Sequence, residues 1–166
     1  TLRCFSNGKR TFEFDPDHET LLSDYYIYPE PNGGYINSVV DLGNNSYIIG
    51  GSTGGTPRGW LSKISYYGGF WHDIWTRIYS GIGDVKINSV AAKDNTIFFA
   101  GRGFDGSTTD GLIGSIDGTT GASNWITSIG GGGYDELSGI ALKRNDINNE
   151  NEIIAVGATT SGALLN

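Results

Sequence analysis

The chain has 166 residues, with 11 Lys or Arg against 18 Asp or Glu, so its formal net charge is -7. A chain of this length can bury a core of its own, and no apolar run approaches the roughly 20 residues that cross a bilayer as a helix. The acidic balance and the lack of Lys and Arg clusters argue against nucleic acid or anionic lipid as the main partner. The 27 glycines and 12% aromatic residues favour tight turns between buried strands, and therefore an all-β protein.

Three short strands are predicted in the N-terminal segment, at residues 2–6, 11–14 and 25–28. They are separated by an Asn-Gly pair at residues 7–8, which is a hairpin-type turn, and by a polar stretch at residues 15–19. Their spacing from later apolar runs predicts that they correspond to the last three strands of a four-strand unit.

The polar stretch contains the weak metal-site candidates Asp15, Asp17 and Glu19. Three carboxylates in one turn suit a hard cation such as calcium. The stretch lacks the glycine and the distal bidentate Glu of a calcium loop, so a solvated turn is the preferred interpretation and calcium the alternative.

An apolar segment that begins at Ile36 recurs at Ile87 and at Leu137, an interval of about 50 residues. Each copy is followed by polar turn residues and then by an apolar run that ends on glycine. In two copies a third and a fourth strand follow, and the last strand contains Trp75 or Trp125. The predicted first strands are 36–40, 87–91 and 137–141, the second 47–51, 97–101 and 153–157, the third 60–64 and 112–116, and the fourth 75–79 and 125–129.

Four short strands in about 50 residues are typical of one blade of a β-propeller. The second strand of each copy reads as a continuous apolar run, which suits a strand covered on both faces, and the fourth is mixed, which suits an outer edge. The sequence thus predicts an all-β fold of β-propeller blades with four antiparallel strands, about three and a half blades in all. A stacked β-sandwich is the rival fold, and the near-constant period disfavours it. The expected division is a partial blade at 1–34, full blades at 35–84 and 85–135, and a partial blade of two strands at 136–166.

Two motifs resemble known families. Residues 131–141 read Gly-Gly-Gly-Tyr-Asp-Glu-Leu-Ser-Gly-Ile-Ala, and residues 153–157 follow as Ile-Ile-Ala-Val-Gly. This resembles bacterial β-propeller repeats, of the seven-bladed-propeller type, that read G-G-x-x-D-x-a-x-x-I-a and then V-x-V-x-G. Those families are mostly parts of large extracellular or cell-surface proteins and supply no catalytic residues. The resemblance therefore implies a location outside the cell or at its surface.

The second motif is Asp117-Gly-Thr-Thr120-Gly121-Ala-Ser-Asn-Trp125, which is similar to the D-x-x-T-G-x-x-x-W signature of quinoprotein-type propellers. The resemblance implies that the Asp-to-Gly segment forms a tight turn and that the Trp docks between adjacent blades. The other full unit keeps Trp75 but lacks the Asp and the Thr. One match supports blade packing and does not support a quinone cofactor.

Structural roles follow for two pairs of equivalent residues. Trp75 and Trp125 are both expected to be largely buried between blades. Asn37 and Asn88 are expected to line a central channel and to hydrogen-bond neighbouring strand or loop backbone, because a buried amide without partners is costly. Asn44 begins an Asn-Asn-Ser sequon in a predicted turn, where a glycan would be tolerated, although a chance match is the default interpretation.

The chemistry-bearing residues form no recognisable catalytic arrangement. No Ser or Cys nucleophile lies in a known motif. His72 and Asp73 could form a general base with its orienting carboxylate, but adjacent residues on a strand point to opposite faces, and a connecting loop is the preferred interpretation of this segment. The favoured hypothesis is a non-catalytic extracellular module, without a cofactor, for binding or assembly with other proteins or with glycans. The alternative is a propeller-type enzyme that acts on a glycan or uses a quinone, for which the motif ending at Trp125 is the only hint.

The expected partners follow from the strand count. The sequence contains no Met, and its strands start and stop inside predicted blades. Propellers usually close with four to eight blades, and open blades leave unpaired edges. A segment of a longer propeller is therefore the first expectation, and a ring or filament completed by other chains is the second.

Overall fold

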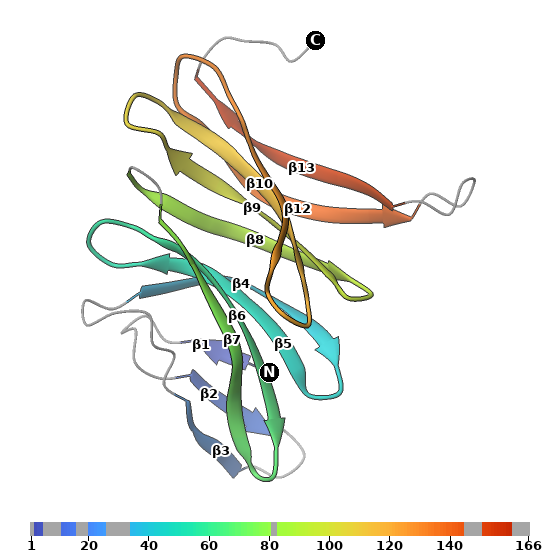
Figure 1. The fold of residues 1–166 in the computed structure, drawn as a ribbon. Coiled ribbons are helices and arrows are strands. Elements are labelled where there is room, and N and C mark those ends of the chain that lie inside the picture. Colours follow the sequence, from blue (N-terminus) through green and yellow to red (C-terminus); the bar gives the residue numbers. More distant parts are fainter. Residues whose placement is uncertain are drawn as a thin grey trace.

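The computed structural model shows an all-β chain and describes residues 2–4, 11–15, 20–25, 34–80, 83–144 and 151–160. No helix within these ranges is long and apolar enough to span a membrane. The strands form antiparallel sheets that follow one another along the chain (Figure 1). Their bounds are β1 Leu2–Cys4, β2 Thr11–Asp15, β3 Thr20–Tyr25, β4 Gly34–Gly43, β5 Ser46–Thr53, β6 Gly59–Tyr67, β7 Phe70–Tyr79, β8 Val85–Lys93, β9 Thr96–Phe104, β10 Thr109–Asp117, β11 Ser123–Ile129, β12 Asp135–Arg144 and β13 Asn151–Thr159.

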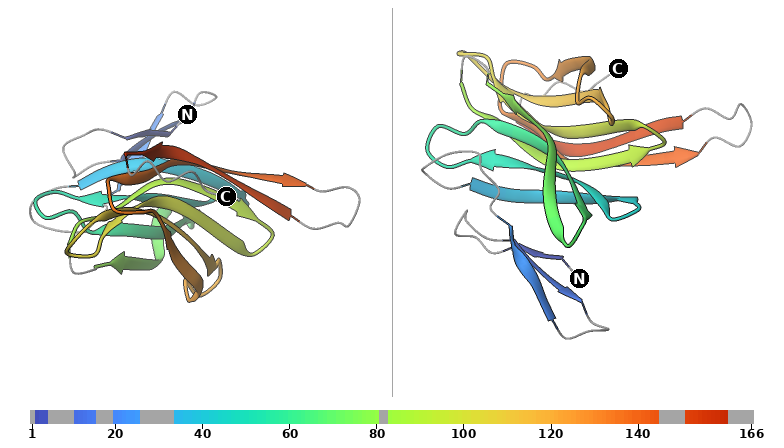
Figure 2. Two further views of the ribbon diagram at one scale, coloured as in Figure 1. Left: turned by 90° about the horizontal axis from the view of Figure 1, so that it is seen from above. Right: turned by 60° about the horizontal axis from the view of Figure 1, so that its bottom comes forward.

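Two of the sheets have four strands, β4–β7 and β8–β11, and strand order in each follows the sequence. The predicted all-β fold with sheets of four antiparallel strands is thus confirmed. A three-stranded sheet, β1–β3, precedes them in the chain, and the pair β12–β13 follows them. The first strands of successive sheets lie side by side, since β8 packs against both β4 and β12 (Figures 1 and 2).

The N-terminal sheet differs from its prediction in one strand. The third strand covers Thr20–Tyr25, so it begins five residues earlier than the predicted strand at 25–28, and Thr20 already pairs with Asp15 of β2. Residues 26–28 lie outside the described part of the chain.

Each of the first strands β4, β8 and β12 contains a β-bulge at the same repeat position. The pairing with the second strand skips Asn37, Asn88 and Ser138, so that two residues there face one on the partner strand. A bulged residue leaves the regular ladder and its side chain is redirected. The bulge thus turns the side chains of Asn37 and Asn88 away from their own sheet.

The glycine that ends the apolar run of each second strand lies beside this bulge and is required by it. A Cβ atom added at Gly51, Gly101 or Gly157 would lie 1.8, 1.9 or 2.0 Å from a carbonyl oxygen of the neighbouring first strand. No side chain fits at such a distance. The repeated glycine that marks the end of each apolar run therefore permits close approach of two backbones.

The main core lies between the two four-stranded sheets. Ile48 of β5 is fully buried there, as its place in a continuous apolar run predicts, and it packs against residues of the next sheet. The cluster combines Ile48, Leu61 and Trp75 from one sheet with Ile87, Val90, Ile97, Phe99 and Ile116 from the other.

Trp75 and Trp125 differ in burial. Trp75 is 8% exposed, as predicted, whereas Trp125 is 40% exposed, so the prediction that Trp125 is buried is wrong. Trp75 is covered by the turn at residues 118–121 of the next sheet. For Trp125 no such cover is seen, since the described residues after β12, 151–160, contain neither a third strand nor an equivalent turn.

We expect Gly101→Ala to destabilise the fold by about 1–3 kcal/mol, because its Cβ would meet the carbonyl oxygen of Lys86. The control is Gly103→Ala on the same strand, where the nearest atom to an added Cβ is 4.0 Å away. Urea unfolding of both variants measures the difference. Equal stability of the two would contradict the requirement for close backbone approach.

We also expect Trp75→Ala to lower the free energy of unfolding by about 3–5 kcal/mol, as for other large buried aromatic residues. Trp125→Ala, its repeat counterpart, should cost less than about 1 kcal/mol because its ring is partly exposed. Chemical denaturation of the two variants checks this order, and a reversed order would show that the burial assignment is incorrect.

Candidate functional site

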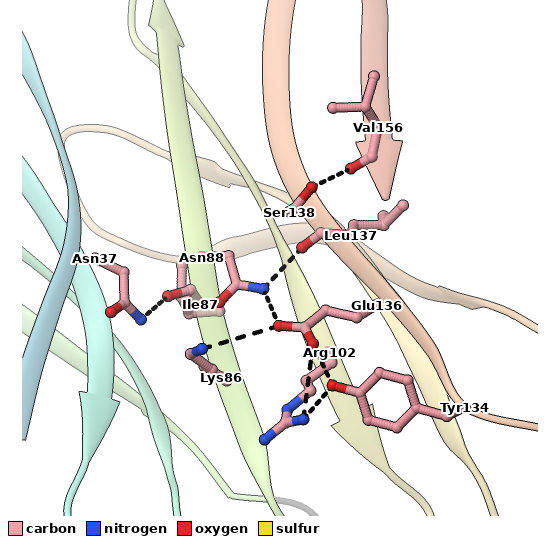
Figure 3. Close-up of polar contacts among 10 residues, drawn as sticks. All are labelled: Asn37, Lys86, Ile87, Asn88, Arg102, Tyr134, Glu136, Leu137, Ser138 and Val156. Carbon is pink, nitrogen blue, oxygen red and sulfur yellow. Dashed lines mark hydrogen bonds and ion pairs between the residues drawn. The ribbon is translucent and has the colours of Figure 1, made fainter. Parts of the chain in front are cut away.

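The bulged asparagines connect neighbouring sheets. Asn37 Nδ2 donates a hydrogen bond to Ile87 O at 2.7 Å, and Asn88 Nδ2 donates one to Leu137 O at 2.8 Å (Figure 3). Both acceptors are backbone carbonyls on the adjacent first strand, which is the kind of partner that the repeat position predicts. Neither amide is left without a partner inside the protein.

The serine after each asparagine completes the connection. Val90 N donates to Ser38 Oγ at 3.0 Å, and Ile140 N donates to Ser89 Oγ at 3.2 Å. Each Asn-Ser pair therefore provides one donor and one acceptor to the backbone of the next first strand. Such paired side-chain bonds fix the register between sheets, because a shift of one residue would break both of them.

The third copy lacks this pair. Ser138 stands where the asparagine is expected, and Gly139 stands where the serine is expected. Ser138 Oγ donates to Val156 O at 3.3 Å within its own sheet (Figure 3). The Asn-Ser connection is thus made twice in the described chain, and the third first strand, β12, does not repeat it.

A charged cluster surrounds Asn88 at the contact between β8 and β12. Asn88 Nδ2 also donates to Glu136 Oε1 at 2.7 Å, and the hydroxyl of Tyr134 donates to Glu136 Oε2. Arg102 Nη1 donates to the Tyr134 hydroxyl and lies 3.7 Å from Glu136 Oε2. Lys86 Nζ lies 3.9 Å from Glu136 Oε1 on the other side (Figure 3).

These contacts determine the ionisation of Glu136 and Tyr134. Burial by itself raises the pKa of Glu136, but hydrogen bonds from Tyr134 and Asn88 and the charges of Arg102 and Lys86 outweigh it and hold that pKa below its usual value. Burial, followed by the bond to the Glu136 carboxylate, raises the pKa of Tyr134. Near neutral pH the carboxylate is ionised and the phenol protonated, so neither group is poised for proton transfer.

Sequence reasoning missed this cluster because its members come from three separate parts of the chain: β8, β9 and residues 134–136. The available signal was the repeat itself. Lys86 and Glu136 directly precede the second and third copies of the repeated first strand, where Tyr35 precedes the first copy. Arg102 follows the glycine of the second copy, where Ser52 follows that of the first. Charges that replace neutral residues at equivalent positions indicate a contact special to one junction.

The quinoprotein-like motif forms a tight turn. The Asp117 carboxylate accepts hydrogen bonds from the backbone N–H of Thr119 and Thr120, at 3.0 and 2.7 Å, and from the Thr120 hydroxyl at 2.8 Å. The bonds from Thr120 are the main cause of a lowered pKa of Asp117. Gly121 closes the turn with a φ of 69°, a conformation that favours glycine.

The turn docks on the preceding sheet through its carbonyl groups. Trp75 Nε1 donates to Gly118 O at 3.3 Å, and Lys63 Nζ donates to the same oxygen at 2.9 Å. Arg77 Nε donates to Gly121 O at 3.0 Å, and a Cβ at Gly121 would lie 2.9 Å from the Trp75 ring. The indole that docks on this motif is therefore Trp75 of the neighbouring sheet, and not the motif's own Trp125.

For the remaining site candidates, the described residues show no arrangement of side chains that would hold a ligand. Asp15 is the last residue of β2, whereas Asp17 and Glu19 lie outside the described residues, so the calcium hypothesis stays a prediction. In the described part of the chain, no group of three or more His, Cys, Asp or Glu side chains is placed to hold a metal ion. Asn44 lies exposed in the β4–β5 turn, with a φ of 52°, and its glycosylation stays a prediction.

Comparison with known proteins assigns no family: no protein-family model matches the chain, and no curated protein matches it either. The resemblances to propeller repeats and to the quinoprotein signature therefore remain predictions from the quoted motifs.

The lowered pKa of Glu136 predicts a pH-dependent contribution to stability. A carboxyl whose pKa is lower in the folded protein stabilises it above the unfolded value of 4.5, and loses that effect as pH falls through the folded value. Wild type should exceed Glu136→Gln in free energy of unfolding at neutral pH, and the gap should close in acid. Denaturant titrations from neutral pH to about pH 3 measure this gap.

Glu152→Gln, which removes an exposed carboxylate of β13, is the control for loss of charge as such. A gap between wild type and Glu136→Gln that persisted undiminished in acid would contradict the role of the ionised carboxylate.

Proposed function

We propose that this chain is a non-catalytic β-propeller-type module that binds or assembles with other protein segments, or with glycans, outside the cell or at its surface. The observation that carries the proposal is the exposed, apolar edge of β13. The location rests on the resemblance to extracellular propeller repeats.

The strand β13 is apolar and exposed, and among the described residues it is paired on one side. Its counterparts β5 and β9 each lie between two strands of a sheet, whereas β13 pairs with β12 alone among the described residues. Ile154 and Val156 are 46% and 58% exposed, against 0% for Ile48 at the position equivalent to Ile154. The strand has no Pro or Lys, and its one charge, Glu152, is near its start. Native edge strands usually carry such protection, so this edge is suited to pairing.

Trp125 supports the same conclusion from a different sheet. The first strand β12 packs on β8, β9 and β10, and Trp125 on the outer strand β11 stays 40% exposed. Two more strands beside β13 would take the places that β10 and β11 hold beside β9. The turn between them would then cover Trp125, as residues 118–121 cover Trp75. One added β-hairpin thus accounts for the open edge of β13 and for the exposure of Trp125. The face of β13 that carries Ile154 is one that a further sheet would cover, as β8–β11 covers Ile48.

The polar contacts support a role without catalysis. Glu136 is ionised and Tyr134 protonated near neutral pH, and Asn88, Lys86 and Arg102 surround them as contacts between strands. These groups stabilise the junction between two sheets. The partner of β13 is, on this proposal, either a further part of a longer propeller or another subunit.

We expect a synthetic peptide that copies residues 109–129, the third and fourth strands of the second unit, to bind beside β13. Fluorescence anisotropy of the labelled peptide measures binding to the purified chain. Val156→Lys should weaken binding, because it places a charge directly opposite the peptide's Ile113, which pairs with Ala100 at the equivalent position of β9. Ile126→Lys, at an exposed residue on the opposite face of β11 from Trp125, should leave binding unchanged.

Absence of peptide binding, or equal binding by Val156→Lys, would contradict the assembly role. Turnover of a glycan panel by the purified chain, or a stoichiometric bound quinone, would instead establish the enzymatic alternative and overturn the proposal.

A further inference from the structure

The hairpin of β6 and β7 ends in exposed aromatic side chains. Tyr67 and Phe70 are directly opposite each other at its end and are 56% and 67% exposed. The His72 ring stacks on Tyr67 with centroids 3.7 Å apart and planes at 11°, and its Nε2 lies 3.2 Å from Tyr67 O. We call Tyr67, Phe70 and His72 the aromatic tip.

The aromatic tip is formed by a tight hairpin turn and extends past the neighbouring strand β5. Gly68 and Gly69 both have positive φ, 63° and 89°, which gives a two-residue hairpin turn that continues the strand pairing to its end. Pairing of β6 with β5 stops at Ser65, so the tip extends past the neighbouring strand (Figure 1). On the other face, the Trp71 ring packs against Tyr66 at 5.3 Å and supports the base of the hairpin.

The fold does not require aromatic residues at this place. The equivalent turn of the next sheet is the polar segment 118–121, which folds back and docks on Trp75. Both turns close a pair of strands, so the exposed rings of Tyr67 and Phe70 are not needed for closure. Exposed aromatic residues that the fold can dispense with indicate a binding surface.

We propose that the aromatic tip is a stacking platform for a neutral pyranose sugar of a glycan. One face of a pyranose ring carries C–H groups and is apolar, and it matches the flat exposed face of a Tyr ring. The sugar hydroxyl groups around that face can bond the Tyr67 hydroxyl and the His72 ring, which are the kind of polar groups that orient a ligand.

The surroundings favour a neutral sugar over an anionic ligand or a protein. Residues 65–74 contain no Lys or Arg, and their one acidic side chain, Asp73, accepts hydrogen bonds from Ser62 and Thr76. Protein hot spots lie in well-packed pockets that a rim shields from water, whereas the rings of Tyr67 and Phe70 are more than half exposed. The inference rests on the binding role proposed above and places the glycan on a surface separate from β13.

The experiment is native affinity electrophoresis in gels that contain mixed-linkage β-glucan, xylan or galactomannan as probes. At least one polysaccharide should retard the chain, and Tyr67→Ala and Phe70→Ala should each weaken the apparent affinity about tenfold. Tyr67→Phe, which keeps the ring, should retain most of the binding. Ile78→Ala, at an exposed apolar residue on the same strand away from the tip, is the control.

Failure of all three polysaccharides to retard the chain would overturn the inference, and so would unchanged retardation of the Tyr67→Ala and Phe70→Ala variants with circular dichroism like that of wild type. Val156→Lys separates the two proposals. Retardation of this variant equal to that of wild type shows that sugar binding does not depend on β13. Loss of retardation would show that the sugar binds elsewhere than at the tip and would overturn the inference.

Discussion

The contact between successive first strands is the constraint on which the rest of this structure depends. A bulge turns Asn37 or Asn88 out of its own ladder, and the amide then bonds to a carbonyl of the next first strand. The bulge is possible because a glycine on the second strand admits a carbonyl oxygen where a Cβ would collide. Once the inner strands are registered in this way, the apolar faces of β4–β7 and β8–β11 meet, and Ile48 and Phe99 are buried between them.

The outer strands are held by a different contact. The turn at residues 118–121 presents carbonyl oxygens, and Lys63, Trp75 and Arg77 of the preceding sheet donate to them. We call the bond between successive first strands the inner contact, and the docking of this turn on the preceding sheet the outer contact. Together these two contacts fix one sheet against the next. Between β8–β11 and β12–β13 the inner contact is strengthened by the Glu136 cluster, while no described residues form the outer one. This asymmetry explains why Trp125 and β13 are exposed apolar features, which we assign to assembly.

Repetition made much of the fold predictable. The four-strand period, the burial of β5 and β9 and the roles of Asn37 and Asn88 follow from residues that recur in register. The same apolar pattern predicts a covered β13, and this prediction is wrong, since Ile154 and Val156 are exposed. The charged cluster around Glu136 was not predictable in this way, because its members occur once each and come together only when β8, β9 and β12 pack. The aromatic tip is visible in the sequence as a run of aromatic residues, but its exposure depends on the ladder passing beyond β5.

The sequence by itself determined the strands and their antiparallel order, because local alternation, turn residues and the glycine opposite each bulge act within one sheet. Tertiary structure alone decided which surfaces are covered. Trp75 and Trp125 stand at equivalent repeat positions, yet one is buried and the other partly exposed, because burial depends on the neighbouring sheet. The same holds for β5 and β13, whose apolar runs are alike and whose surroundings differ. A strand's conformation is a property of its own residues, whereas its burial is a property of what packs against it.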